Sequence, residues 1–187
     1  MGLDKNEMAR AMKNDTAHIR PVHLGDLPAL QQICRQTFFE TFSHSCTEAD
    51  MQAYLAKSFA EAQLASELHN PDSAFYFLET EGHVLGYLKL NFAQAQTELQ
   101  DANAIEIERI YVLHDFQGQG VGQALYQHAL HIAHSHHARY IWLGVWEHNH
   151  NALRFYEKNG FVPFDKHTFH LGSDAQTDIM MKLELPG

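Results

Sequence analysis

The sequence predicts a mixed α/β fold of the α+β kind, in which helices flank a mostly antiparallel sheet of about seven strands. Residues 74–80 and 84–92 both have strand patterns, and only the turn-forming residues 81–83 separate them, which is typical of a β-hairpin. Between residues 105 and 146, a strand, a glycine-rich loop, a helix and a second strand follow one another. This order implies one parallel pair of strands joined by a right-handed crossover.

The N-terminal part of the chain is predicted to form one short strand and three helices. Residues 19–22 read as the strand, and Pro21 indicates an edge position. Asp26 is expected to cap the first helix, whose apolar residues recur at helical spacing. These residues are Leu27, Leu30, Cys34, Thr37, Phe38 and Thr41. Residues 47–50 resemble a capping box that opens a second helix, and a third helix covers about 60–69.

The C-terminal part is predicted to add further strands and helices after a polar loop. In chain order these are the loop at 93–103, a strand at 104–113, a helix from Val121 to about 137, a strand at 140–146, a helix at 152–159 and strands at 161–169 and 177–185. No repeat or linker interrupts them, so residues 17–187 are predicted to form a single domain. The polar residues 1–16 are predicted to form a disordered tail.

Composition and charge argue against several classes of protein. Hydrophobic residues make up 45% of the chain and charged residues 19%, which is typical of a globular domain. The formal net charge of −10 disfavours a nucleic-acid partner, because phosphates attract basic surfaces, and it is compatible with a cationic acceptor. No apolar run approaches the roughly 18 residues that a membrane span needs, so no membrane partner is expected.

The cysteines and histidines have no spacing that indicates a metal or redox site. Cys34 and Cys46 match no metal-ligand pattern, and Cys34 is expected to be a buried thiol on its helix. A buried thiol and the absence of a redox spacing fit a reducing cytoplasm, so a cytoplasmic location is predicted. His128, His131 and His134 recur at every third position, but no carboxylate joins them. We therefore expect no metal.

Residues 117–122, Gln-Gly-Gln-Gly-Val-Gly, stand between a predicted strand and a predicted helix. Glycines allow the backbone to approach an anion closely, and the N–H groups at a helix start can bind a phosphate. The loop is neither a Walker A sequence nor a good dinucleotide fingerprint. Taken alone, such a loop is more often a tight turn into a helix.

A second motif changes this interpretation. It runs Asn149-x-x-Ala152-x-x-Phe155-Tyr156-x-Lys158-x-Gly160-Phe161. Together with Gln117-x-x-Gly120-x-Gly122, it resembles the GNAT superfamily of N-acetyltransferases, which transfer an acetyl group from acetyl-CoA to an amine. The resemblance covers about residues 74–185. Residues 37–42, with Tyr54, Leu55 and Phe59, are similar to bacterial polyamine acetyltransferases of the PaiA type.

The resemblance implies a GNAT fold, in which the two parallel strands splay apart and open a slot for the pantetheine arm of acetyl-CoA. Residues 117–122 would hold the pyrophosphate, and Val112 and Leu113 would pair their backbone with the pantetheine amides. The full set implied for coenzyme binding is Ile110, Tyr111, Val112, Leu113, Gln117, Gly118, Gln119, Gly120, Val121, Gly122, Asn149, Ala152, Tyr156 and Lys158. Many family members have Arg or Lys where this chain has Gly118 and Gln119, so Lys158 or Arg154 would contribute more of the affinity. Both are equally explained as solvated helix charges.

The same resemblance places the hydroxyl of Tyr156 near the thioester sulfur, where it would protonate the departing thiolate as a general acid. Its alternative role is an ordinary core tyrosine. Glu106 and Glu108 share one face of their strand, and one of them would deprotonate the amine, because a protonated amine cannot attack. The resemblance favours Glu106 as the base and Glu108 as a ligand of the cationic acceptor, and a bulge could exchange them. Alternatively, one glutamate pairs with Arg109.

The acceptor pocket is predicted to be walled by Phe38, Phe42, Tyr54 and Trp146 with Glu108, and Phe39 and His44 are further candidates. The predicted function is acetyl-CoA-dependent transfer to the primary amine of a small cationic acceptor, a polyamine being favoured, by direct attack in a ternary complex. The alternatives are acetylation of peptide N-termini or protein lysines, a non-catalytic CoA sensor, and a generic phosphate-binding domain. The resemblance also allows a homodimer.

Overall fold

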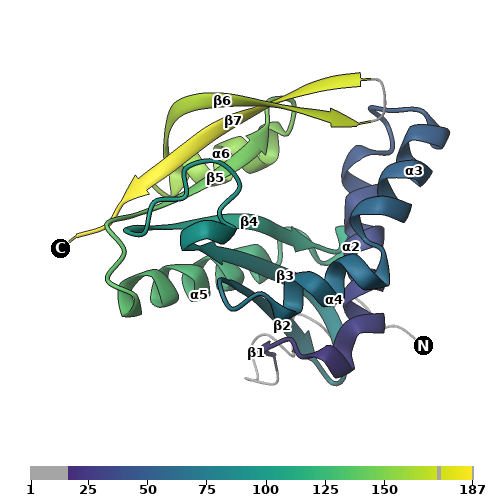
Figure 1. Cartoon of the computed structure of the whole chain (residues 1–187), viewed down its shortest axis with the longest axis horizontal. Helices are drawn as coiled ribbons and strands as arrows, with labels where there is room; N and C mark the ends of the chain where they lie inside the picture. Colours follow the sequence, from purple (N-terminus) through teal and green to yellow (C-terminus); the bar gives the residue numbers. More distant parts are fainter. Residues whose placement is uncertain (1–16, 172–173, 187) are drawn as a thin grey trace.

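The computed structural model describes residues 17–171 and 174–186, so the predicted tail at 1–16 lies outside the described residues. Seven strands form one sheet in the order β1-β2-β3-β4-β5-β7-β6 (Figure 1). The strands are β1 (His18–Pro21), β2 (Ser73–Thr80), β3 (His83–Phe92), β4 (Ala104–Val112), β5 (Tyr140–Trp146), β6 (Val162–Leu171) and β7 (Asp174–Glu184). The helices are α2 (Leu27–Phe42), α3 (Glu48–Ser58), α4 (Glu61–His69), α5 (Val121–Ser135) and α6 (His150–Lys158), with short 3-10 turns η1 (Leu24–Asp26), η2 (Ala93–Ala95) and η3 (His114–Phe116).

Alternation along the strands sends apolar side chains to both faces of the sheet. Phe77 and Tyr87 pack with α2, α3 and α4, whereas Leu78 and Leu88 pack with α5 and α6. Figure 1 accordingly shows α2, α3 and α4 grouped at one side of the sheet, away from α5. The two largest clusters of buried apolar side chains among the described residues therefore lie on opposite faces of the sheet.

The predicted hairpin at residues 81–83 is confirmed. Glu81 and Gly82 join β2 to β3 and both have positive φ, 50° and 77°. Two consecutive left-handed residues are the geometry of a type I′ turn, which matches the twist of the flanking strands. Glycine is the residue that adopts such a φ without strain.

The predicted parallel pair is also confirmed, and its strands diverge. β4 and β5 pair only through Ala104, Ile105 and Glu106, whose partners begin at Tyr140. β4 then continues to Val112 and β5 to Trp146 with no further pairing between them in the described residues. The gap that opens between the two strands positions the candidate site.

A β-bulge in β4 lies directly at this divergence. Lys89 pairs with Arg109 and Leu90 pairs with Ile107, so Glu108 is an extra residue in β4. Such a bulge increases the local twist and changes which side chains share a face. Glu106 and Glu108 share a face by alternation, and the bulge adds Arg109 to that side, so that all three line one cavity.

Several local predictions need correction. The side chain of Asp26 does not cap α2, because η1 precedes the helix and the Asp26 carboxylate accepts the N–H of His23 and binds Arg20 instead. β6 and β7 are longer than expected, and α6 begins at His150 rather than at residue 152. Thr47 does cap α3 through the N–H of Asp50. No helix in the described part of the chain has the length and apolarity to cross a membrane.

Candidate active site

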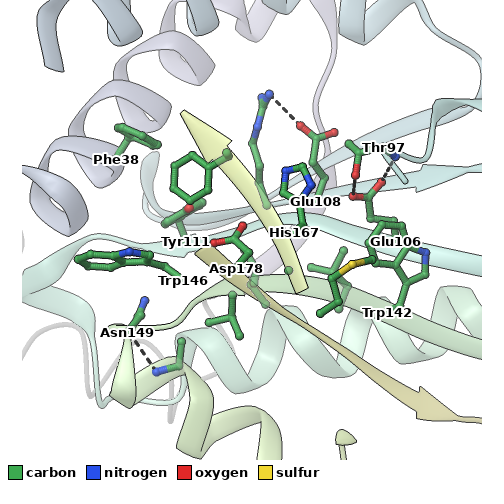
Figure 2. Close-up of a pocket in the computed structure, with 18 of the residues that line it drawn as sticks. Phe38, Thr97, Glu106, Glu108, Tyr111, Trp142, Trp146, Asn149, His167 and Asp178 are labelled. Atoms are coloured by element: carbon green, nitrogen blue, oxygen red, sulfur yellow. Dashed lines mark hydrogen bonds and ion pairs between the residues drawn. The ribbon is translucent and has the colours of Figure 1, made fainter. Parts of the chain in front are cut away.

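A cavity of about 280 Å³ lies where β4 and β5 separate (Figure 2). Its wall contains eleven residues of the predicted site, contributed by α2, α3, β4, β5 and α6 together with the turn before α6. They are Phe38, Phe42, Tyr54, Glu106, Glu108, Ile110, Tyr111, Trp146, Asn149, Ala152 and Tyr156. Val112, Leu113, residues 117–122 and Lys158 lie outside this wall. The structure therefore brings the predicted acceptor and catalytic residues together.

Aromatic rings form one side of the cavity. Phe38 stacks on Tyr54 with ring centroids 4.3 Å apart, and Phe42 packs against Trp146 at 5.3 Å. Phe39 is 47% exposed and, like His44, is not part of the wall. The helical spacing of α2 turns Phe38 and Phe42 inward and Phe39 outward, which corrects the wider candidate set.

Glu106 lies on the opposite side of the cavity and is only 3% exposed. Its Oε2 accepts the backbone N–H of Thr97 at 2.8 Å and the side-chain amide of Asn91 at 3.1 Å, and its Oε1 accepts the Thr97 hydroxyl at 2.5 Å (Figure 2). Burial raises the pKa of Glu106, and the bonds from Thr97 oppose this shift. Both carboxylate oxygens are thus already engaged inside the protein.

Glu108 belongs to a cluster of four charges. It binds Lys89 at 2.5 Å and Arg109 at 2.9 Å, and Glu67 of α4 binds the same two cations at 3.0 and 2.9 Å. Burial by itself would lower the pKa of Arg109, but the charges of Glu108 and Glu67 raise it overall. The alternative that one glutamate pairs with Arg109 is therefore confirmed for Glu108. Glu67, which completes the cluster, was not predicted.

Asp178 of β7 and His167 of β6 also line the cavity, and neither was predicted from the sequence. They face each other across the β6–β7 ladder, and His167 Nδ1 lies 2.7 Å from Glu98. Burial raises the pKa of Asp178 to about 6. The available signal was an acidic residue directly before the apolar run from Ile179 to Met181 in a predicted strand. Nothing in the sequence indicated which strand lies beside β5.

Tyr156 is 6% exposed and reaches the cavity from α6. Its ring packs edge-on against Phe161 at 5.4 Å. Burial raises the pKa of Tyr156 well above its usual value, so the phenol keeps its proton at neutral pH. A protonated phenol is the state that a general acid requires. Asn149 begins the same helix, and its Oδ1 accepts the N–H of Ala152 at 3.1 Å, which confirms the N-cap role.

The glycine-rich loop ends at the start of α5. Gly118 and Gly120 have φ values of 73° and 90°, which glycine adopts without strain. The first helical bond of α5 runs from the N–H of Ala124 to the carbonyl of Gly120, so the N–H groups of residues 121–123 have no partner within the helix. Free N–H groups at a helix N-terminus fit a pyrophosphate.

The end of β4 presents a partly free edge to the gap. Leu113 donates its N–H to Leu85 and accepts the N–H of Phe116, so its backbone groups are already paired. In an antiparallel ladder the N–H groups of successive residues point to opposite sides of the strand. Because the N–H of Leu113 points to β3, those of Val112 and Ile110 point toward β5. The Val112 carbonyl accepts the side chain of Gln117 at 3.2 Å. Ile110, whose N–H faces the gap, is therefore a better candidate than Leu113 for pairing with the pantetheine amides.

The described residues give little support for a metal site or for a cysteine nucleophile. They contain no group of three or more histidine, cysteine or acidic side chains placed to hold a metal ion. Cys34 is buried and reduced, and burial raises its pKa to about 11, so its thiol is not an activated nucleophile. Arg154 and Lys158 are exposed on α6, and Arg154 donates to Asn151 at 2.6 Å.

The fold and this cavity are those of an acyltransferase. Residues 27–161 match the model of the acetyltransferase (GNAT) family, and the chain belongs to that family. It is an N-acetyltransferase whose cosubstrate is acetyl-CoA, as the two sequence motifs predicted.

Relatives and solved structures agree with this assignment. The chain is 44% identical over 160 residues to an uncharacterized N-acetyltransferase from the pepI 3′ region of Lactobacillus delbrueckii subsp. lactis, covering 86% of this chain and 92% of the relative. It is 32% identical over 150 residues to an uncharacterized N-acetyltransferase of Mycobacterium tuberculosis, covering 78% and 91%. The PaiA N-acetyltransferase from Thermoplasma acidophilum, crystallised in complex with coenzyme A, has a similar fold with a TM-score of 0.76, 22% identity and coverage of 90% of this chain and 99% of that one.

Proposed function

We propose that this enzyme transfers the acetyl group to a primary amine of a small cationic acceptor, with a polyamine the favoured substrate. The observation that carries the proposal is the composition of the cavity at the divergence of β4 and β5. Aromatic rings and the carboxylates of Glu98, Glu106, Glu108 and Asp178 both line this cavity. Aromatic faces and carboxylates both attract ammonium groups.

The coenzyme is proposed to bind along the gap from the start of α5 to α6. The free N–H groups of residues 121–123 hold the pyrophosphate, with Gly118 and Gly120 allowing the close approach. Ile110 and Val112 pair with the pantetheine amides, and Asn149 and Ala152 flank the arm. Lys158, which is exposed on α6, is proposed to bind a phosphate of the coenzyme. The complex of PaiA with coenzyme A supports this part of the proposal.

The residues of the chain divide the chemistry between them. The cavity holds the amine against the thioester, which removes much of the entropic barrier of a two-substrate reaction. A backbone N–H on the gap side of β4, near Val112, stabilises the negative charge that develops on the thioester oxygen. Tyr156 gives its proton to the departing sulfur as the C–S bond breaks. No covalent acetyl-enzyme is proposed, since Cys34 is buried and protonated.

Glu106 and Glu108 are proposed to act mainly through their charge. Glu108 is held between Lys89 and Arg109, and both oxygens of Glu106 accept hydrogen bonds from Thr97. Glu106 can therefore take a proton from the amine only through a bound water. A cytoplasmic location and a homodimer stay predictions.

The test is the release of free CoA from acetyl-CoA with spermidine, spermine, lysine peptides and peptides with a free N-terminal alanine. Turnover on a polyamine, reduced about 10²-fold in Tyr156→Phe, is the expected result. Tyr126→Phe is the matched control, because Tyr126 is buried nearby on α5 and lies outside the cavity wall.

Other outcomes would select the alternatives. Turnover confined to the alanine peptides would indicate that a peptide N-terminus, and not a polyamine, is the acceptor substrate. The solved Escherichia coli ribosomal-protein-S18-alanine N-acetyltransferase has a similar fold, with a TM-score of 0.67, 20% identity and coverage of 91% of this chain and 96% of that one. Binding of acetyl-CoA without turnover on any amine would indicate a CoA sensor.

A further inference from the structure

The carboxylate of Asp178 lies between the aromatic residues of the cavity and Glu106. Figure 2 shows Asp178 in the middle of the cavity, with Tyr111 and Trp146 on one side and Glu106 on the other. It is brought there by β7, which lies between β5 and β6 and pairs Asp178 with Trp146. A Cβ at Gly144 would lie 3.2 Å from Asp178 Oδ2, so the glycine leaves room for the carboxylate.

The oxygens of Asp178 differ from those of the two glutamates. Oδ1 of Asp178 is buried and has no hydrogen-bond partner among the described residues. By contrast, Glu106 and Glu108 have all four oxygens engaged by protein donors. A buried hydrogen-bond acceptor without a donor lowers the stability of the fold. An N–H group of the amine substrate would donate the missing hydrogen bond and remove that cost.

We propose that Asp178 binds the reacting ammonium group of the acceptor and takes its proton before the amine attacks. This inference rests on the proposed function. One N–H bond of the ammonium breaks, and its proton passes to a carboxylate oxygen of Asp178. The freed nitrogen lone pair forms the C–N bond, and the C–S electrons leave on sulfur, which takes the proton of Tyr156. The second nitrogen proton restores the Tyr156 phenol, and Asp178 releases its proton to solvent.

The surroundings of Asp178 are suited to this exchange. Among the described residues, Tyr54 of α3, Tyr111 of β4 and His167 of β6 are the titratable groups that act on Asp178 or are affected by it. β5 presents only uncharged residues to it. Because the pKa of Asp178 is raised to about 6, the carboxylate is mostly ionised at pH 7 yet holds a proton more readily than an ordinary aspartate.

The experiment compares Asp178→Asn with Glu106→Gln in the full-length protein. For Asp178→Asn we expect kcat/KM for spermidine at pH 7 to fall about 10²-fold, with the Kd for acetyl-CoA unchanged. The wild-type pH profile should have an acid limb near pH 6, and this limb should be absent in Asp178→Asn. Glu106→Gln should keep the limb even where its rate is lower.

A weakly basic amine separates a base from a structural residue. Trifluoroethylamine is mostly unprotonated at pH 7, so Asp178→Asn should acetylate it within about tenfold of the wild-type rate. A variant that had merely lost its structure would fail with both amines. An Asp178→Asn enzyme that keeps the wild-type rate and acid limb with spermidine, or a limb lost only in Glu106→Gln, overturns the proposal. A wild-type enzyme that acetylates no amine contradicts the proposed function instead.

Discussion

The proposed coenzyme side and the proposed acceptor side of the gap are built from different parts of the chain. The main part of the proposed coenzyme side is a set of backbone N–H groups close together in sequence, those that follow Gly120. The acceptor side consists of side chains that α2, α3, β4 and β7 bring together, from Phe38 to Asp178. A backbone site depends on local glycine geometry, whereas a side-chain site depends on the register of distant strands. Substitutions should therefore affect the two sides in different ways.

The largest expected effect is on stability at the acceptor side. The pKa of Asp178 is about 6 in the folded protein against an ordinary 3.8, so the folded state binds the extra proton between these values. Stability contributed by this group is present below about pH 4 and is lost as the pH rises to about 6. Asp178→Asn should thus be more stable than wild type at pH 7, by up to about 3 kcal/mol.

Urea unfolding of both proteins at several pH values measures this difference. The gain should shrink toward pH 4, where the wild-type carboxyl is protonated. A variant less stable than wild type at pH 7 would show that Asp178 has a stabilising partner and would contradict the comparison.

The next largest expected effect is on acetyl-CoA binding, compared between two glycine variants that should lose similar amounts of stability. Ala at Gly120 or at Gly82 must adopt a positive φ, which costs about 1 kcal/mol in either case. Only Gly120 precedes the free N–H groups of α5. We expect Gly120→Ala to weaken acetyl-CoA binding about tenfold by calorimetry, and Gly82→Ala, the matched control, to bind as wild type does. Equal affinity of the two variants for acetyl-CoA would contradict a pyrophosphate site at the start of α5.

The smallest effect concerns the aromatic wall. Phe42→Leu keeps an apolar side chain but removes a ring face, and a cation–π contact contributes about 0.5–1 kcal/mol. The KM for spermidine should rise about two- to fivefold, while the KM for acetyl-CoA stays unchanged. Phe164→Leu, on β6 outside the cavity wall, serves as the control. An equal rise in both KM values would place Phe42 on the coenzyme side as well.

The same contrast explains what the sequence could predict. The hairpin turn at Gly82, the crossover from β4 to β5 and the cap at Asn149 depend on neighbouring residues, and all three are confirmed. The two motifs at residues 117–122 and 149–161, each local in sequence, predicted the family. Asp178 was missed because β7 inserts beside β5, out of chain order, and no local pattern reports that pairing. The engagement of Leu113 likewise depends on a distant partner, Leu85.

The identity of the acetylated product tests the proposed substrate class most directly. Wild-type enzyme would be incubated with acetyl-CoA and equal concentrations of spermidine and a peptide that begins with alanine, and both would be analysed by mass spectrometry. We expect spermidine to gain one acetyl group faster than the peptide, and Tyr156→Phe to slow this gain about 10²-fold. Acetylation of the peptide alone would contradict a cavity built for a small cationic amine.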